Sequence, residues 1–203
     1  MNQNLQKNKS FFDRWARTYD FSLFQFWMKK FQAPVLKEIN FSKKAKILDI
    51  SCGTGELLAS LRQKDTRHNL KLYGTDLSSK MLEKARVKLP EDIILTAGDV
   101  HQLPFKSNAF EYVISTEAFH HYGNQQKAVQ EMVRVTKPGG KVVVVDINLF
   151  LRPIHKLFEV FEPGCVKINS KNEMHHLFRN TGLKEIKQER IFLFAVMTVG
   201  IKR

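Results

Sequence analysis

The sequence predicts an α/β protein built around a doubly wound, mostly parallel sheet of seven strands, with helices on both faces and an antiparallel edge strand. From Ala45 onward, short apolar runs alternate with segments of helical length, which is typical of βαβ units. Several of these runs are rich in β-branched residues, as buried parallel strands are. The first five strand candidates are residues 46–50, 71–75, 93–97, 112–115 and 141–146.

Helices are expected between the strands, at residues 55–63, 79–89 and 125–136. The sequence KPGG at 137–140 predicts a stop between the last of these helices and the following strand. A further helix is expected over residues 171–181, ending before Gly182. Two strand-like runs follow, 184–193 and 195–201, and the short connection predicts that they pair antiparallel at one edge of the sheet.

A length of 203 residues fits one domain. We expect four consecutive parts in it: a helical segment at 1–44, the main α/β core at 45–146, an insertion at 147–170, and a helix with a strand pair at 171–203. The first part is crowded with aromatic side chains, nine of them between Phe11 and Phe31.

Composition indicates an ordinary globular protein, since hydrophobic residues make up 43% of the chain. No apolar run approaches the ~20 residues of a membrane-spanning helix, and the first ten residues lack the apolar stretch of a secretory signal. Cys52 and Cys165 form no CxxC pair, which argues against a zinc module or a disulfide framework and favours the cytoplasm.

The net charge of +13 is concentrated at the two ends of the chain. Residues 1–46 carry +7 and residues 147–203 carry +5, whereas the middle is nearly balanced. This distribution suits solubility, or contact with an anionic partner such as RNA, a lipid surface or an acidic substrate.

The segment ILDISCGTGELL, at 47–58, predicts a ligand-binding loop at the carboxyl end of the first strand. Gly53 and Gly55 would allow close approach of a ligand. Leu58 stands where a dinucleotide-binding fingerprint has its third glycine, so a diphosphate is disfavoured. Asp76 closes the second strand and could accept both hydroxyls of a ribose, while Asp99, after the third strand, could accept from an adenine amino group. The set suits an adenosine.

With these residues the chain resembles the class I methyltransferases that use S-adenosyl-L-methionine (SAM). The matching pieces are LDISCGTG, the acidic Asp76, GDVHQLPF, STEAFHHY and VTKPGGKVVVVD. The segment FDRWARTYD resembles the N-terminal part of the subgroup near the ubiquinone and menaquinone C-methyltransferases. The resemblance implies a Rossmann-like fold and SAM as the cofactor. The chain departs from the family pattern at Ser51, where the family usually has glycine.

The resemblance also implies a role for individual residues. Asp49 and the loop 51–55 would lie against the methionine part of SAM, Asp76 would take the ribose hydroxyls, and the methyl-donor side would be lined by 116–118. Residues 1–44 would then be a helical lid and 147–170 a substrate-side insertion. The expected SAM-binding residues are Tyr19, Asp49, Ser51, Cys52, Gly53, Thr54, Gly55, Asp76, Leu77, Met81, Gly98, Asp99, Val100, Thr116, Glu117 and Ala118.

Methyl transfer from a sulfonium is an in-line displacement, so alignment and exclusion of water can supply most of the catalysis. If the acceptor loses a proton, the candidates for catalysis are Tyr19, Glu117, His120 and His121. We expect the adjacent histidines to point in different directions, and no metal site, because spacing supplies no third ligand. Cys52 has no basic neighbour in its loop and is not expected to be a nucleophile.

The leading interpretation is a SAM-dependent methyltransferase acting on a small or lipid-like molecule, with peripheral contact to an anionic membrane. The chief rival is an RNA methyltransferase, which the net charge favours. Against it, the segment after the fourth strand lacks the Asn/Asp-Pro-Pro-aromatic signature, and 203 residues hold no added RNA-binding module. A SAM-binding protein without catalysis is a third hypothesis, and an oxidoreductase is a more remote fourth.

Overall fold

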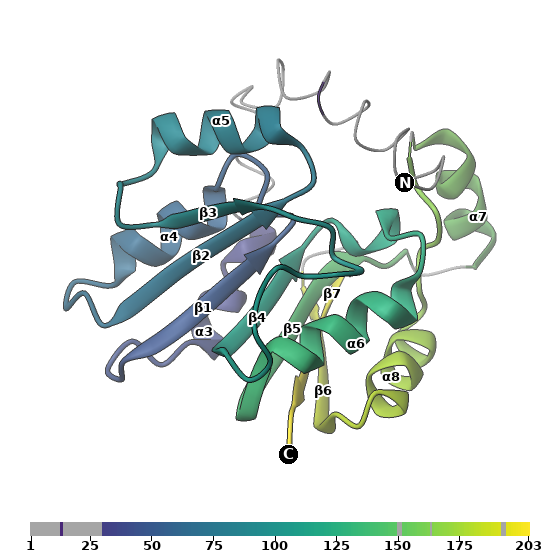
Figure 1. Ribbon diagram of the computed structural model, residues 1–203. Coiled ribbons are helices and arrows are strands. Elements are labelled where there is room, and N and C mark those ends of the chain that lie inside the picture. Colours follow the sequence, from purple (N-terminus) through teal and green to yellow (C-terminus); the bar gives the residue numbers. More distant parts are fainter. Residues whose placement is uncertain (1–12, 14–29, 150–151, 163, 192–193) are drawn as a thin grey trace.

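The computed structural model describes residues 13, 30–149, 152–162, 164–191 and 194–203 (Figure 1). Its centre is one seven-stranded sheet in the order β3-β2-β1-β4-β5-β7-β6. The strands are β1 (Ala45–Ile50), β2 (Leu70–Asp76), β3 (Ile94–Ala97), β4 (Phe110–Thr116), β5 (Thr136–Ile147), β6 (Lys184–Ile191) and β7 (Ala195–Ile201). The helices are α3 (Val35–Glu38), α4 (Glu56–Lys64), α5 (Ser79–Lys88), η1 (Phe119–His121), α6 (Gln125–Val135), α7 (Arg152–Phe161) and α8 (Lys171–Asn180).

The five strands β1 to β5 are parallel, with β1 paired to both β2 and β4. The two C-terminal strands form the other side of the sheet, where β7 runs antiparallel to both β5 and β6. The predicted mixed sheet is therefore confirmed, including the antiparallel pairing of the last two strands. β7 lies between β5 and β6, so the edge position belongs to β6.

Two apolar cores cover the two faces of the sheet, because successive side chains of a strand point to opposite faces. Ile47 of β1 belongs to the core under α4 and α5, together with Leu58 and Leu82. Its neighbour Leu48 belongs to the core under α6 and α8, together with Phe178. The central strands are thus buried on both sides, which explains why they read as apolar runs in the sequence.

Three helices begin at residues whose side chains cap the helix N-terminus. The N-cap of α8 is Ser170, whose hydroxyl accepts from the amide of Glu173 while the Glu173 carboxylate accepts from the amide of Ser170. The side chains of Ser78 and Asn124 cap α5 and α6 in the same sense, each accepting a backbone N–H.

The KPGG segment does not separate a helix from a strand as predicted. Helix α6 ends at Val135 as expected, but β5 begins at Thr136 and runs through the four residues with a shift of register against β4. Gly139 has φ 76°, a conformation that glycine adopts without a Cβ clash, and its N–H donates to the carbonyl of Lys202. Pairing with the last residues of the chain therefore continues the sheet across this turn-like sequence.

Within the described ranges, none of the helices is both long enough and apolar enough to cross a lipid bilayer.

Candidate active site

The carboxyl ends of the parallel strands meet at one edge of the sheet, where the ends of β1 and β4 border a hollow that is partly open to solvent. Strands β1 and β4 contribute Asp49 and Thr116, and the β1–α4 loop contributes most of the remainder. The lining residues are Gln32, Asp49, Ser51, Cys52, Thr54, Glu56 and Thr116. Five of these were expected to contact SAM.

Asp49 is buried in the wall of this hollow. Among the described residues, its Oδ1 atom has no hydrogen-bond partner. Burial, and then the nearby Asp76 carboxylate, raise the pKa of Asp49 well above its ordinary value. A buried carboxylate oxygen with these properties suits a ligand that brings positive charge or a hydrogen-bond donor.

Asp76 joins two loops at the end of β2. Its Oδ2 accepts from the amide of Gly53 at 2.9 Å, and its Oδ1 accepts from the amide of Ser78 at 2.8 Å. Burial raises the pKa of Asp76, and the two backbone amides oppose that rise. The hydroxyl of Ser78 in turn donates to the carboxylate of Asp13, so residue 13 lies at this end of the sheet.

Ser51, the departure from the family pattern, has φ 56° and therefore lies in the left-handed region that favours glycine. The hydroxyl of Tyr122 lies within hydrogen-bond distance of two serines, 3.0 Å from Ser51 Oγ and 2.9 Å from Ser115 Oγ. Tyr122 is buried, and burial raises its pKa. Tyr122 was not among the residues predicted from the sequence, because nothing in the spacing shows that it bridges the loops after β1 and β4.

The other expected SAM-binding residues occupy the neighbouring strand ends. Gly55 is the N-cap of α4 with φ 84°. Gly98 has no room for a side chain, because a Cβ there would lie 2.8 Å from atoms of both Pro104 and Thr75. Asp99 accepts from the amide of His101 at 2.9 Å and contacts its ring at 2.6 Å. Met81 and Val100 are buried, while Leu77 and Ala118 are half-buried.

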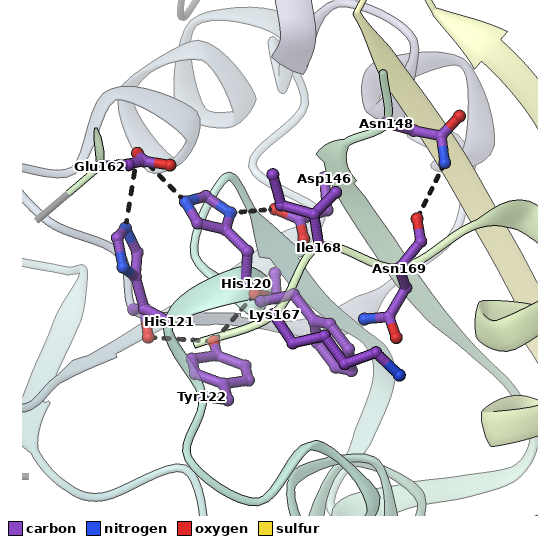
Figure 2. Close-up of polar contacts among 12 residues, drawn as sticks. His120, His121, Tyr122, Asp146, Asn148, Glu162, Lys167, Ile168 and Asn169 are labelled. Atoms are coloured by element: carbon purple, nitrogen blue, oxygen red, sulfur yellow. Dashed lines mark hydrogen bonds and ion pairs between the residues drawn. The ribbon is translucent and has the colours of Figure 1, made fainter. Parts of the chain in front are cut away.

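His120 and His121 lie on η1, directly after β4, and both are buried, with 1% and 8% of their surface exposed. Figure 2 shows both rings turned toward Glu162, which follows α7. His120 Nε2 is 3.4 Å and His121 Nε2 is 4.0 Å from Glu162 Oε1. On its other side, His120 Nδ1 lies 2.6 Å from Asp146 Oδ1 at the end of β5.

The expectation that the two histidines diverge is therefore wrong. Their ring centroids are 4.0 Å apart with the planes tilted by 45°. The tight turn of η1 and the carboxylate of Glu162 hold both rings on one side. No metal site was expected because spacing supplied no third ligand, but the structure brings a third potential ligand, Glu162, to the two histidines from 41 residues beyond His121.

Opposing effects set the charge of the two imidazoles. Burial alone would lower the pKa of His120, but the carboxylates of Asp146 and Glu162 outweigh it and raise the pKa to about 10. Burial, followed by the adjacent His120, lowers the pKa of His121 to about 4. His120 is therefore protonated and His121 neutral near pH 7.

Glu117 links this cluster to the hollow, because it directly follows Thr116. It has φ 52°, and its amide donates to the carbonyl of Val145. Burial, and then the charge of Asp146, raise the pKa of Glu117 to about 8. Tyr19, the remaining expected catalytic residue, lies outside the described residues, as does most of the aromatic N-terminal segment.

The comparisons with known proteins agree with this geometry. The family model described as a methyltransferase domain matches residues 48–144. The chain is 31% identical over 199 residues to the demethylmenaquinone methyltransferase of Staphylococcus aureus, an alignment that covers 92% of this chain and 79% of the relative. The protein is a class I SAM-dependent methyltransferase. Its cofactor is SAM.

Solved structures of methyltransferases share the fold. A SAM-dependent methyltransferase from Thermotoga maritima superposes with a TM-score of 0.75 at 19% identity, covering 96% of this chain and 99% of that one. A phosphoethanolamine N-methyltransferase from Haemonchus contortus, in complex with SAM, superposes with a TM-score of 0.74 at 19% identity, covering 95% of this chain and 60% of that one.

Cys52 is not equipped to be a nucleophile in this methyltransferase. Burial, and then the charges of Asp49 and Asp76, raise the pKa of its thiol well above the ordinary value, so the thiolate is disfavoured. We expect Cys52→Ser to bind SAM and transfer methyl groups within a few-fold of the parent protein. Calorimetry and a methyl-transfer assay would check this; a folded variant that binds SAM but has lost all activity would contradict it.

Proposed function

We propose that this enzyme methylates a small, lipid-like acceptor of the quinone type. The observation that carries the proposal is a polar cluster beside the hollow at the strand ends, in which His120, His121 and Asp146 are buried and Glu117 and Glu162 are half-buried. Such a cluster can hold an acidic oxygen of an otherwise apolar ring. The Staphylococcus aureus relative, whose name specifies demethylmenaquinone, supports the same class of acceptor.

We propose that the residues around the hollow hold SAM, which supplies an electrophilic methyl group on a sulfonium. The unpartnered oxygen of Asp49 fits the positively charged methionine end. Asp76 lies at the end of β2, as a ribose-binding carboxylate would, and its contact with Gly53 ties the glycine loop to the same place. Asp99 and Val100, after β3, would border the adenine. The remaining SAM contacts follow the residues named from the sequence.

On the acceptor side, the chain aligns the reacting groups and keeps water out. Thr116, Glu117 and Ala118 would line the path between SAM and the cluster. The His120 imidazolium, held between Asp146 and Glu162, would place positive charge near a developing phenolate oxygen. Tyr19 and the lid at 1–44 stay part of the proposal, with the insertion at 147–170 as the opposite wall.

The acceptor class can be tested by following the methyl group. We expect label from methyl-labelled SAM to enter demethylmenaquinone when the purified enzyme is given that lipid, a quinone-free lipid extract and bulk RNA in parallel. Chromatography of the extracted products would show where the label goes. Label in RNA alone would overturn the acceptor assignment in favour of a nucleic-acid methyltransferase.

The ribose assignment predicts that Asp76→Asn weakens SAM binding. Hydrogen bonds to a charged group contribute about 1.5–3 kcal/mol each, so we expect a loss of at least about tenfold in affinity by calorimetry. The new amide side chain would keep one oxygen for a backbone N–H, and a thermal melt would show whether the loop contacts survive. The matched control is Glu91→Gln, which removes an exposed carboxylate outside the site. Unchanged affinity in Asp76→Asn would rule out the ribose role.

We further propose that the enzyme works in the cytoplasm against an anionic membrane surface, where a lipid-like acceptor would be found. Helix α7 carries a row of exposed apolar side chains, with Leu157 59% and Val160 80% exposed, beside Ile154 and Phe161. Lys156 is exposed on the same helix. Apolar and basic side chains together are typical of helices that lie in a lipid interface, and the net charge of +13 favours anionic lipids.

The membrane proposal predicts that Leu157→Glu combined with Val160→Glu reduces co-sedimentation with anionic vesicles by several-fold, because it places two carboxylates in the interface. Val87→Glu, at an apolar residue of α5 that is 92% exposed, is the matched control and should bind like the parent protein. Equal binding by all three proteins would show that α7 does not contact the lipid.

A further inference from the structure

Three side chains near the methyl-transfer site approach one another as metal ligands do. One ligand atom from each of His120, His121 and Glu162 lies within 4.8 Å of the other two. The residues come from two segments, η1 after β4 and the residue that follows α7, and they converge with both histidines buried and Glu162 half-buried (Figure 2). A set of two imidazoles and one carboxylate is a donor combination found in catalytic zinc sites and in non-haem iron(II) sites.

The distances suit such a site with little movement. Metal–nitrogen and metal–oxygen bonds of about 2.0–2.2 Å in a tetrahedral arrangement separate neighbouring ligand atoms by about 3.3–3.6 Å. His120 Nε2 is 3.4 Å from Glu162 Oε1, which falls in that range. His121 Nε2 is 4.0 Å from the same oxygen, so a small rotation of the Glu162 side chain would bring it into range.

A second, independent feature is the orientation of His120. Its Nδ1 atom lies 2.6 Å from the buried carboxylate of Asp146, which directs Nε2 toward Glu162. Metal-binding histidines commonly donate their other ring N–H to a carboxylate in this way. Within the part of the chain that the structure describes, His120 Nε2 and Glu162 Oε2 are buried without a hydrogen-bond partner, although both face the cluster.

The backbone holds the ligand-bearing segments together. The carbonyl of His120 accepts from the amides of Val166 and Lys167, at 2.8 Å and 3.2 Å, which ties the chain after α7 to η1. The amide of Glu162 donates to the carbonyl of Phe158 and so continues the last turn of α7. These backbone contacts hold the glutamate beside the histidines.

The carboxyl groups around the two histidines also favour a bound cation. Asp146, Glu162 and Glu117 bring three carboxyl groups close to the two imidazoles. Buried carboxylates are costly unless they are paired or coordinate a metal.

We propose that His120, His121 and Glu162 bind one divalent transition-metal ion, of the zinc or iron(II) type, with Asp146 as the residue that orients His120. Three protein ligands leave a coordination position for water or for an oxygen of the acceptor. The ion would then act as a Lewis acid on that oxygen. The inference rests on the proposed function only for the identity of this last ligand, and in the metal-bound protein the ion would take the place of the His120 imidazolium as the positive charge beside that oxygen.

Metal binding can be measured without SAM or acceptor, which separates this inference from the proposed function. The full-length protein would be dialysed against a chelator and titrated with Co²⁺, whose visible absorption reports nitrogen and oxygen ligands, and with Zn²⁺ and Mg²⁺ by calorimetry. We expect one Co²⁺ or Zn²⁺ per chain and much weaker binding of Mg²⁺, because imidazole suits the former ions.

Substitutions at the proposed ligands would show where the ion binds. Glu162→Gln keeps the shape of the side chain and should lower the affinity for Co²⁺ at least tenfold, as should His121→Ala. Asp146→Asn should lower it by about 10–100-fold and alter the absorption spectrum, as expected of a group that acts through His120. The matched control changes the adjacent pair His175 and His176 on α8 to alanine, which should leave binding unchanged. Thermal melts would show that each variant is folded.

The inference is overturned if the stripped protein takes up no Co²⁺ or Zn²⁺, if Mg²⁺ binds equally well, or if only the His175/His176 variant loses the ion. Those results would leave His120, Asp146 and Glu162 as an ion network without a metal, and the methyltransferase proposal would still stand. Conversely, stoichiometric metal in a protein that fails to methylate quinones would support the metal site and reject the acceptor.

Discussion

The parallel pairing of β1 with β2 on one side and with β4 on the other is the constraint on which the rest of the structure depends. After β3 the chain returns across β1 to form β4, so the strand order reverses at β1. Connections on the two sides of this point leave in opposite directions, and their loops separate above the strand ends. The hollow beside Asp49 and Thr116 lies where this separation is expected.

The same arrangement brings acidic side chains together in a protein that is otherwise strongly basic. Asp49, Asp76 and Asp146 stand at or near the ends of β1, β2 and β5, and Glu117 directly follows β4. Burial raises the pKa of Asp49, Asp76 and Glu117 because water no longer solvates their charge. These four carboxyl groups therefore lie together at one edge of the sheet, while the excess positive charge belongs to the two ends of the chain.

Ser51 shows how the glycine loop keeps its shape without a glycine at that position. A non-glycine residue with positive φ costs about 1–2 kcal/mol, because its Cβ approaches the following carbonyl oxygen. The contact of the Ser51 hydroxyl with Tyr122, which also contacts Ser115, can offset part of that cost. The loop after β1 is thus coupled to the end of β4.

Amino-acid pattern alone predicted the strands, the helices α4, α5, α6 and α8, and the glycine loop with Asp76 and Asp99, because these features depend on local periodicity and on residues at strand ends. The predicted stop at KPGG was wrong, because these residues are part of β5. Gly139 and Gly140 pair there with Lys202, and this pairing requires the end of the chain to be in place. Only the tertiary structure decided the directions of His120 and His121 and brought Glu162 to them. Those positions depend on how α7 packs after β5, and no spacing in the sequence reports a contact between side chains so far apart along the chain.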